Sequence, residues 1–223
     1  MDFDEEGYEE VSGSLIFVDE PWEQATGSIK SLFPWKEPEI VPVCISISGA
    51  PGTSKKSLAK KLGKALDIPA IVGLTRTAAK YGADLDKAST WDDEFMILMA
   101  QMWQEREFDE FVTAGSMIDI LAHAHWHAHL SGSNKDMTML REMVNFVGAQ
   151  IGECYSVFLY TPYTKLPKND RIRSVDHQYN MAIDKLIERY LELFDIDYLP
   201  LQGNPSKKYG VAMGYLDHFG IGS

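Results

Sequence analysis

The chain has 223 residues, of which 45% are hydrophobic and 24% are charged, a balance typical of a globular protein with a sizeable core. No apolar run reaches the roughly 20 residues that span a bilayer, and the acidic N-terminus differs from a signal peptide. We therefore expect a cytoplasmic protein without a membrane partner. The net charge of −12 is concentrated in residues 1–40, which hold eleven acidic side chains and two lysines. The remainder is nearly balanced and lacks the clustered Lys and Arg that tight binding of duplex DNA normally requires.

Residues 1–40 are interpreted as an acidic N-terminal extension, partly disordered, that precedes a folded domain over residues 41–223. Within the extension, residues 1–12 are expected to be disordered. Residues 14–18 are expected to form a short strand, and residues 21–33 a helix with proline near its start.

From residue 41 onward, apolar segments rich in β-branched residues alternate with segments of helical periodicity. Strands are expected at 41–49, 69–73, 110–115, 154–162 and 196–201. Helices are expected at 53–66, 75–82, 91–107, 116–130, 135–152 and 175–194, and in a short C-terminal segment. This alternation within one domain predicts a three-layer α/β fold with a parallel central sheet.

The strand, glycine turn and basic helix over residues 41–66 are typical of a nucleotide phosphate-binding loop. In the pattern G-x-x-x-x-G-K-[ST], Gly49 is the first glycine and Lys55 is the lysine that reaches the β- and γ-phosphates. Ser54 stands at the second glycine, and Lys56 stands where a Ser or Thr would hold Mg²⁺. The expected nucleotide-binding residues are Gly49, Ala50, Pro51, Gly52, Thr53, Ser54, Lys55, Lys56 and Ser57. A strand–turn–helix corner that binds nothing is the alternative.

A second polar segment, residues 166–187, contains Arg171 and Arg173 just before a long helix. Mobile arginines can stabilise the charge that spreads over a phosphoryl group during transfer, so both are candidate catalytic residues. The alternative is a solvated loop whose arginines face water.

Three motifs in order, GAPGTSKKS at 49–57, TRT at 75–77 and NDRIRSVD at 169–176, resemble those of small P-loop kinases of phage and bacterial type. These are the AAA-28 and NadR-like proteins, close to the thymidylate kinase superfamily, and the resemblance extends from residue 41 to about residue 215. It implies a P-loop kinase-like fold and the use of ATP with Mg²⁺.

The resemblance also implies roles for individual residues. Arg173 matches the lid arginine, and Arg171 replaces a glycine of the lid motif. Thr75, Arg76 and Thr77 fall where such kinases contact the phosphoryl acceptor. Asn204 belongs to the segment that forms the loop beside the adenine.

The chain departs from this family at the end of the third strand, where Asp-Arg-Ser is common and Ala114-Gly115-Ser116 stands instead. Together with Lys56, this change removes expected Mg²⁺-handling groups, so the metal ligands stay unassigned. Either Asp119, Asp92 or Asp93 substitutes, with Asp119 as the candidate catalytic carboxylate, or catalysis is impaired.

The resulting functional hypothesis is an ATP-dependent phosphotransferase of phage type, acting in the host cytoplasm. Its acceptor would be a nucleoside, a nucleoside monophosphate or a hydroxymethylated pyrimidine in DNA, and kinases of this size often form homodimers. The alternative is a catalytically inactive pseudokinase that serves as a nucleotide-binding or protein-partner module.

Other conspicuous side chains are expected to serve packing. Cys44 and Cys154 are interpreted as small core residues of two strands in a reducing compartment. The aromatic and Met side chains of the helix at 91–107 are interpreted as core, with an acceptor pocket as the alternative: Trp91, Phe95, Met96, Met99, Met102 and Trp103. The histidines of HAHWHAH have i,i+4 spacings compatible with zinc, but we favour a polar helix face or pH-sensitive packing: His123, His125, His127 and His129.

Overall fold

The computed structural model describes residues 42–74, 90–164 and 177–221. Its centre is a five-stranded sheet in the order β2-β3-β1-β4-β5, in which every pair of neighbours is parallel. The strands are β1 (Cys44–Ser48), β2 (Ala70–Ile71), β3 (Phe111–Ala114), β4 (Val157–Tyr160) and β5 (Tyr198–Pro200). The predicted parallel sheet is therefore confirmed.

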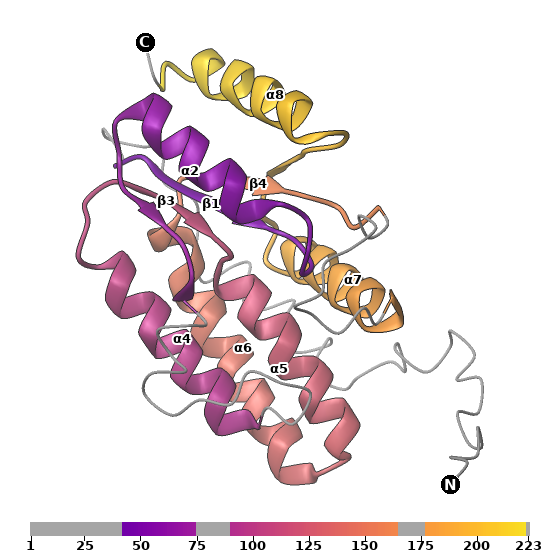
Figure 1. The fold of residues 1–223 in the computed structure, drawn as a ribbon. Coiled ribbons are helices and arrows are strands. Elements are labelled where there is room, and N and C mark those ends of the chain that lie inside the picture. Colours follow the sequence, from indigo (N-terminus) through magenta and orange to yellow (C-terminus); the bar gives the residue numbers. More distant parts are fainter. Residues whose placement is uncertain (1–41, 75–89, 165–176, 222–223) are drawn as a thin grey trace, which may run out of the picture.

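Helices cover both faces of this sheet. They are α2 (Lys55–Leu66), α4 (Trp91–Glu105), α5 (Met117–Ser131), α6 (Asn134–Cys154), α7 (His177–Leu193) and α8 (Pro205–His218). Figure 1 shows α2 and α8 on one side of the sheet and α4, α5, α6 and α7 on the other. Among the described residues, no helix is both long and apolar enough to cross a membrane. The arrangement is the expected three-layer α/β fold.

Strand register explains why β1 is buried on both faces. Ile45 pairs with Val112 of β3 and with Val157 of β4, and all three side chains join the apolar cluster under α2 and α8. On the other face, Phe111 and Phe158 join the cluster under the remaining helices. Side chains alternate along a strand, so this register places one apolar cluster on each face of the sheet. It also determines where neighbouring strands end relative to one another at the sheet edge.

Local capping fixes the starts of two helices that the sequence predicts. The Thr90 side chain accepts a hydrogen bond from the backbone N–H of Asp93, and the Asp93 carboxylate accepts one from the Thr90 N–H. Ser116 and Asp119 form the same kind of reciprocal box at the start of α5. These boxes satisfy backbone N–H groups that the first helical turn leaves unpaired.

Cys154 does not lie in a strand, as the sequence suggested, but closes α6, because that helix continues to the residue before Tyr155. Cys44 lies in β1 as expected. Both thiols are free and half-buried, and burial raises the pKa of each to about 11. The elements expected at 14–18, 21–33 and 75–82 lie outside the described residues.

The packing interpretation of α4 is wrong for two of its aromatic residues. Trp103 is 73% exposed and Phe95 is 44% exposed, whereas Met102 is buried. The buried stripe of this helix runs through Ile97, Leu98, Gln101, Met102 and Glu105. Phe95 and Trp103 are displaced from this stripe around the helix and therefore face outward.

Candidate functional site

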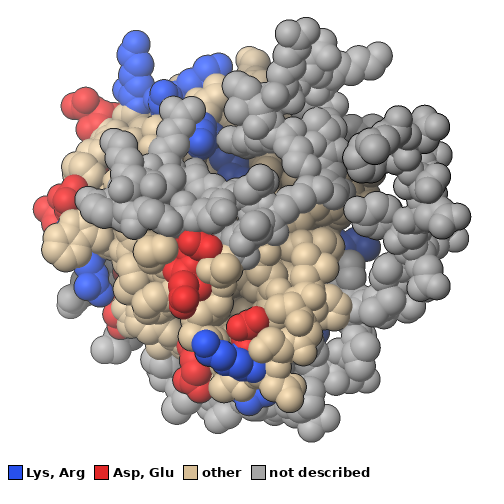
Figure 2. Space-filling view, turned by 60° about the horizontal axis from the view of Figure 1, so that its bottom comes forward, with Lys and Arg blue, Asp and Glu red and all other residues tan. Residues whose placement is uncertain are grey.

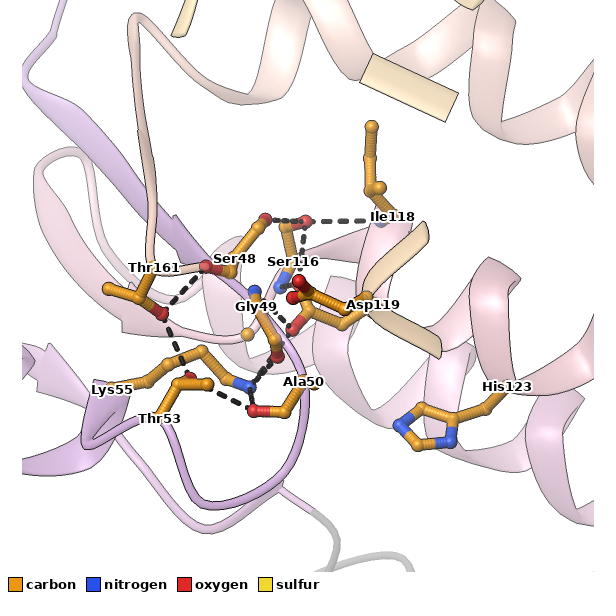
Figure 3. A network of polar contacts seen from close by, with 12 residues as sticks. Ser48, Gly49, Ala50, Thr53, Lys55, Ser116, Ile118, Asp119, His123 and Thr161 are labelled. Atoms are coloured by element: carbon orange, nitrogen blue, oxygen red, sulfur yellow. Dashed lines mark hydrogen bonds and ion pairs between the residues drawn. The ribbon is translucent and has the colours of Figure 1, made fainter. Parts of the chain in front are cut away.

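The candidate site lies where β1, β3 and β4 end at the same edge of the sheet. The segment Gly49–Ser54 leaves the end of β1 and leads into α2. Since β1 lies between β3 and β4, this loop is flanked by Ser116 after β3 and by Thr161 after β4. Figure 3 shows the side chains that converge there. Ligands of open parallel α/β sheets bind at this edge.

The loop is held tightly against the segment after β4. A Cβ atom on Gly49, whose φ is +150°, would lie 2.4 Å from both the carbonyl oxygen and the Oγ1 of Thr161. Buried Thr53 donates from its Oγ1 to the Ala50 carbonyl at 2.9 Å and accepts from Thr161 Oγ1 at 2.9 Å. Only glycine fits this close approach at position 49, which accounts for the glycine there.

Ser54 keeps the backbone conformation that its position demands. Its φ is +72°, in the left-handed region, although the sequence pattern places glycine there. The side chain makes no capping hydrogen bond to α2 that would compensate. A non-glycine residue in this conformation costs on the order of 1 kcal/mol, so the substitution preserves the loop shape with strain.

Lys55 lies over the loop at the first position of α2. Its Nζ donates to the carbonyl oxygens of Gly49 and Ala50, the latter at 3.0 Å, and lies 3.3 Å from Asp119 Oδ1. The expected lysine of the motif is thus brought into the loop, where Figure 3 shows it beside Ala50.

Asp119 reaches the same place from α5. Its Oδ1 accepts from the Gly49 N–H at 3.2 Å, and its Oδ2 accepts from the Ser116 N–H at 2.9 Å. The Ser116 Oγ lies 2.7 Å from the Ser48 Oγ, which links the start of α5 to the end of β1. A buried carboxylate therefore stands beside the loop on the β3 side, although Ala114 and Gly115 provide no charged side chain there.

Asp92 and Asp93, the other two candidate substitutes, do not join this group. Asp93 is used in the capping box of α4. Asp92 borders a cavity of about 300 Å³ together with Ser131 and Lys135, at the C-terminal end of α5. The loop contacts the opposite end of α5, so only Asp119 of the three is brought to it.

Two charged residues near the loop, Asp184 and Lys208, are not among the site residues predicted from the sequence. Asp184 on α7 accepts from the Tyr163 N–H at 2.9 Å, while its buried Oδ1 has no hydrogen-bond partner among the described residues. Burial raises the Asp184 pKa, and the Tyr163 N–H and the Lys55 charge oppose that rise. Lys208 on α8 is 8% exposed and donates to the Thr53 carbonyl at 3.2 Å. The sequence feature that could have indicated Lys208 is its helical spacing from Ala212 and Leu216, with which it forms the buried stripe of α8.

The remaining predicted site residues are placed as follows. Lys56 is half-buried and Ser57 is exposed on α2. Asn204 is exposed and caps α8, since its Oδ1 accepts from the Lys207 N–H at 2.9 Å. Five residues lie outside the described part of the chain: Thr75, Arg76, Thr77, Arg171 and Arg173.

The histidines of α5 contact side chains of other helices. His123 Nδ1 lies 2.5 Å from the Tyr179 hydroxyl, and His125 Nδ1 lies 2.8 Å from the Tyr190 hydroxyl. Burial lowers the pKa of His123 to about 4, so it is neutral at pH 7. The described residues contain no group of three or more His, Cys, Asp or Glu side chains placed to hold a metal ion. These contacts agree with the packing interpretation.

No family model and no curated protein matches this chain. Among solved structures, a deoxyadenosine kinase from M. mycoides with the products dCMP and dCDP bound is similar over 78% of this chain and 98% of its own. The sequence identity is 13% and the TM-score 0.57. A structure of deoxyadenosine kinase from M. mycoides with dATP covers the same shares, with 14% identity and a TM-score of 0.53. The chain has a P-loop kinase-like fold, as the sequence predicted.

Proposed function

We propose that this chain is an ATP-dependent phosphotransferase of the nucleoside kinase type. The proposal rests on one observation above all, the convergence of Lys55 and Asp119 on the Gly49 loop at the C-terminal edge of a parallel sheet. A loop of backbone N–H groups at a helix start, with a lysine beside it, suits the binding of a nucleotide polyphosphate. The similarity to deoxyadenosine kinase structures agrees in fold.

In this proposal the loop residues 49–57 bind the phosphates of ATP, and Lys55 offsets their charge. Arg171 and Arg173 close over the transferring phosphoryl group. Thr75, Arg76 and Thr77 hold the acceptor, and Asn204 lies in the loop beside the adenine. Transfer of this kind depends on positioned cations more than on covalent chemistry.

Asp119 is the proposed protein group for Mg²⁺. Lys56 has no oxygen to offer at the usual ligand position, whereas Asp119 places a carboxylate beside Lys55. Asp184, whose Oδ1 makes no hydrogen bond within the described part of the chain, is a second carboxylate, close enough to Lys55 for the lysine charge to oppose the rise that burial causes in its pKa. Carboxylates are ligands that Mg²⁺ prefers, so the residues present fit the ion. Held there by the Asp119 carboxylate, Mg²⁺ would supply positive charge that neutralises the charge developing during phosphoryl transfer.

The acceptor class is proposed as a nucleoside or nucleoside monophosphate, with a hydroxymethylated pyrimidine in DNA as the phage-type variant. Figure 2 shows Lys and Arg mixed with Asp and Glu over the described part of the face at the bottom of Figure 1. The described part of this face offers no broad basic path for a duplex, and the nearly balanced charge of residues 41–223 likewise favours a free nucleoside or nucleotide over DNA.

The alternative function is a pseudokinase that binds nucleotide or a protein partner without turnover. Lys56 and the uncharged end of β3 favour it. Ala114 and Gly115 supply neither a carboxylate nor a guanidinium at this strand end, where the Gly115 N–H donates to the Ile47 carbonyl at 3.0 Å.

Calorimetric titration of ATP with and without Mg²⁺ tests the proposal. The proteins to compare are wild type, Lys55→Ala and the matched control Lys60→Ala, which removes an exposed lysine from the same helix. We expect Mg²⁺ to strengthen binding, Lys55→Ala to weaken it about 10-fold to 100-fold, and Lys60→Ala to change it less than about 2-fold. Turnover is then measured with nucleosides and nucleoside monophosphates as acceptors.

The possible results distinguish the kinase from the pseudokinase. Wild-type protein that binds no ATP contradicts the kinase and the nucleotide-binding pseudokinase alike. Binding that ignores Mg²⁺, without turnover on any acceptor, supports the pseudokinase. Binding strengthened by Mg²⁺ together with acceptor phosphorylation supports the kinase.

A further inference from the structure

Lys208 is a buried cation that contacts the phosphate loop from the side of α8. Its side chain is 8% exposed, and its Nζ donates to the Thr53 carbonyl at 3.2 Å. We propose that Lys208 is a positioning residue that holds the Thr53–Ser54 peptide in the orientation needed for phosphate binding. This inference rests on the proposed nucleotide site and names a residue outside the sequence motif.

Peptide geometry connects Lys208 to the inside of the loop. The Thr53 carbonyl and the Ser54 N–H belong to one peptide unit, and no described peptide bond is cis. In a planar trans peptide these two groups point in opposite directions. With Lys208 bound to the carbonyl, the Ser54 N–H is directed away from α8. Backbone N–H groups at this point of a phosphate loop are the groups that face phosphate oxygens.

The same peptide is under strain because a serine stands where glycine is usual. Ser54 has a φ of +72°, which a side chain with a Cβ atom disfavours. A flip of the Thr53–Ser54 peptide would return φ to negative values and turn the Ser54 N–H toward α8. The Thr53 side chain does not oppose that flip, since its hydrogen bonds to Ala50 and Thr161 involve only Oγ1. The Lys208 hydrogen bond does oppose it.

The position of Lys208 is fixed by packing. It shares the buried stripe of α8 with Ala212 and Leu216, and these two pack in the same apolar cluster as Leu58 and Leu62 of α2. Burial lowers the pKa of Lys208, the charge of Lys55 adds to that effect, and Asp184 opposes it. A buried ammonium needs a hydrogen-bond acceptor, and the Thr53 carbonyl provides one. Helix α8, which carries Lys208, therefore packs against α2, the helix that follows the loop.

A double-mutant cycle on ATP binding tests the inference, with Lys208→Met, Ser54→Gly and the combination of both. Lys207→Met is the matched control, because Lys207 is the exposed neighbour on the same helix. We expect Lys208→Met to weaken ATP binding at least about 10-fold and Lys207→Met less than about 2-fold. In the Ser54→Gly background the same Lys208→Met change is expected to cost less than about 3-fold, since glycine accepts the unflipped backbone without strain.

A second measurement needs no nucleotide. The three-bond coupling between the amide and α protons of Ser54 reports φ by nuclear magnetic resonance, and we expect it to change in Lys208→Met and to stay constant in Lys207→Met. An unchanged φ at Ser54 overturns the inference, even if ATP does not bind. So does a Lys208→Met protein that melts at a lower temperature yet binds ATP like wild type, or a loss of affinity that Ser54→Gly does not reduce. Absence of ATP binding in wild type bears on the proposed function alone.

Discussion

At the scale of single residues, Gly49 lies so close to Thr161 that an added Cβ would be 2.4 Å from two of its oxygens. Thr161 Oγ1 lies 3.0 Å from the Ser48 carbonyl oxygen and 2.9 Å from Thr53 Oγ1, so this threonine joins the end of β1 to the far side of the loop. A glycine at position 49 is what allows the threonine to come this near. The fit between them sets the shape of the loop before any ligand arrives.

We therefore predict that Gly49→Ala abolishes ATP binding. The added Cβ would meet backbone and side-chain oxygens of Thr161 at 2.4 Å, and the loop would have to move. Gly132→Ala is the control, because Gly132 also has a positive φ, of +59°, but has no atom within 4 Å of an added Cβ. The control is expected to lose about 1 kcal/mol of stability and keep its ATP affinity. Equal loss of affinity in both variants, measured by calorimetry, would contradict this prediction.

Residue types that carry a family pattern were predictable, and residues placed by tertiary structure were not. Lys55 follows from the motif, and Asp119 from its place one turn into α5, and both reach the loop. Asp184 and Lys208 lie far from the loop along the chain and were not among the predicted site residues, so only the packing of α7 and α8 reveals them. Their burial is the physical feature that a motif does not encode.

At the scale of elements, α8 is a helix with two exposed glycines in its interior. An added Cβ at Gly210 or at Gly214 would meet no atom within 4 Å, and neither residue has a positive φ. Glycine in a helix interior costs about 1 kcal/mol relative to alanine, because it loses more backbone entropy on folding.

We predict that Gly210→Ala and Gly214→Ala each raise the free energy of unfolding by about 0.5–1 kcal/mol, or the melting temperature by about 1–4 °C. Gly63→Ala in α2 should act in the opposite direction, since its Cβ would lie 2.8 Å from the Ile68 carbonyl oxygen. Thermal unfolding followed by circular dichroism measures all three. If Gly63→Ala stabilised the protein, the space around a helical glycine would not decide whether its replacement by alanine raises or lowers the free energy of unfolding.

Element types followed from the sequence more readily than their ends or their exposed faces. The capping boxes at Thr90 and Ser116 mark the helix starts directly. The end of α6 was missed because Cys154 and Tyr155 suit a strand by composition, whereas hydrogen bonding carries the helix through Cys154. The exposure of Trp103 was missed because hydrophobicity alone does not tell which side of a helix meets the core.

At the scale of the whole molecule, a buried polar network joins α4 to the end of β3. Glu105 is 5% exposed and accepts from Gln101 Nε2 at 2.7 Å and from the Tyr155 hydroxyl at 2.8 Å. Gln101 Nε2 also donates to the Gly115 carbonyl at 2.9 Å. Burial raises the pKa of Glu105 from 4.5 to about 7, and hydrogen bonds from Gln101 and Tyr155 only partly oppose that rise.

This pKa predicts a pH-dependent stability. Between pH 4.5 and about 7 the folded protein keeps a proton on Glu105 that the unfolded chain has lost. The stability that the protein has with Glu105 protonated is therefore fully present below pH 4.5 and is lost as the pH rises through about 7. The loss approaches about 3 kcal/mol in the free energy of unfolding.

Glu105→Gln should remove this slope, since an amide does not titrate. Urea unfolding at about pH 5 and about pH 8 measures the difference in the free energy of unfolding between wild type and variant. Other titrating groups, such as His123, are present in both proteins, so their effects cancel in this difference. We expect the variant to gain stability relative to wild type as the pH rises. A difference that stays constant with pH would mean that Glu105 does not titrate in this range.

The contacts of Lys55 within the protein have a consequence for how the proposed site would take up a ligand. Its ammonium group is already solvated by the protein, through two carbonyl oxygens of its own loop and the carboxylate of Asp119. A polyphosphate bound as proposed would gain this lysine by exchange, and each contact that it made with the ammonium would replace one that the protein gives up. We would therefore expect selectivity for polyphosphates, because a single small anion offers fewer oxygens to replace the three that surround Lys55 than a chain of phosphates does.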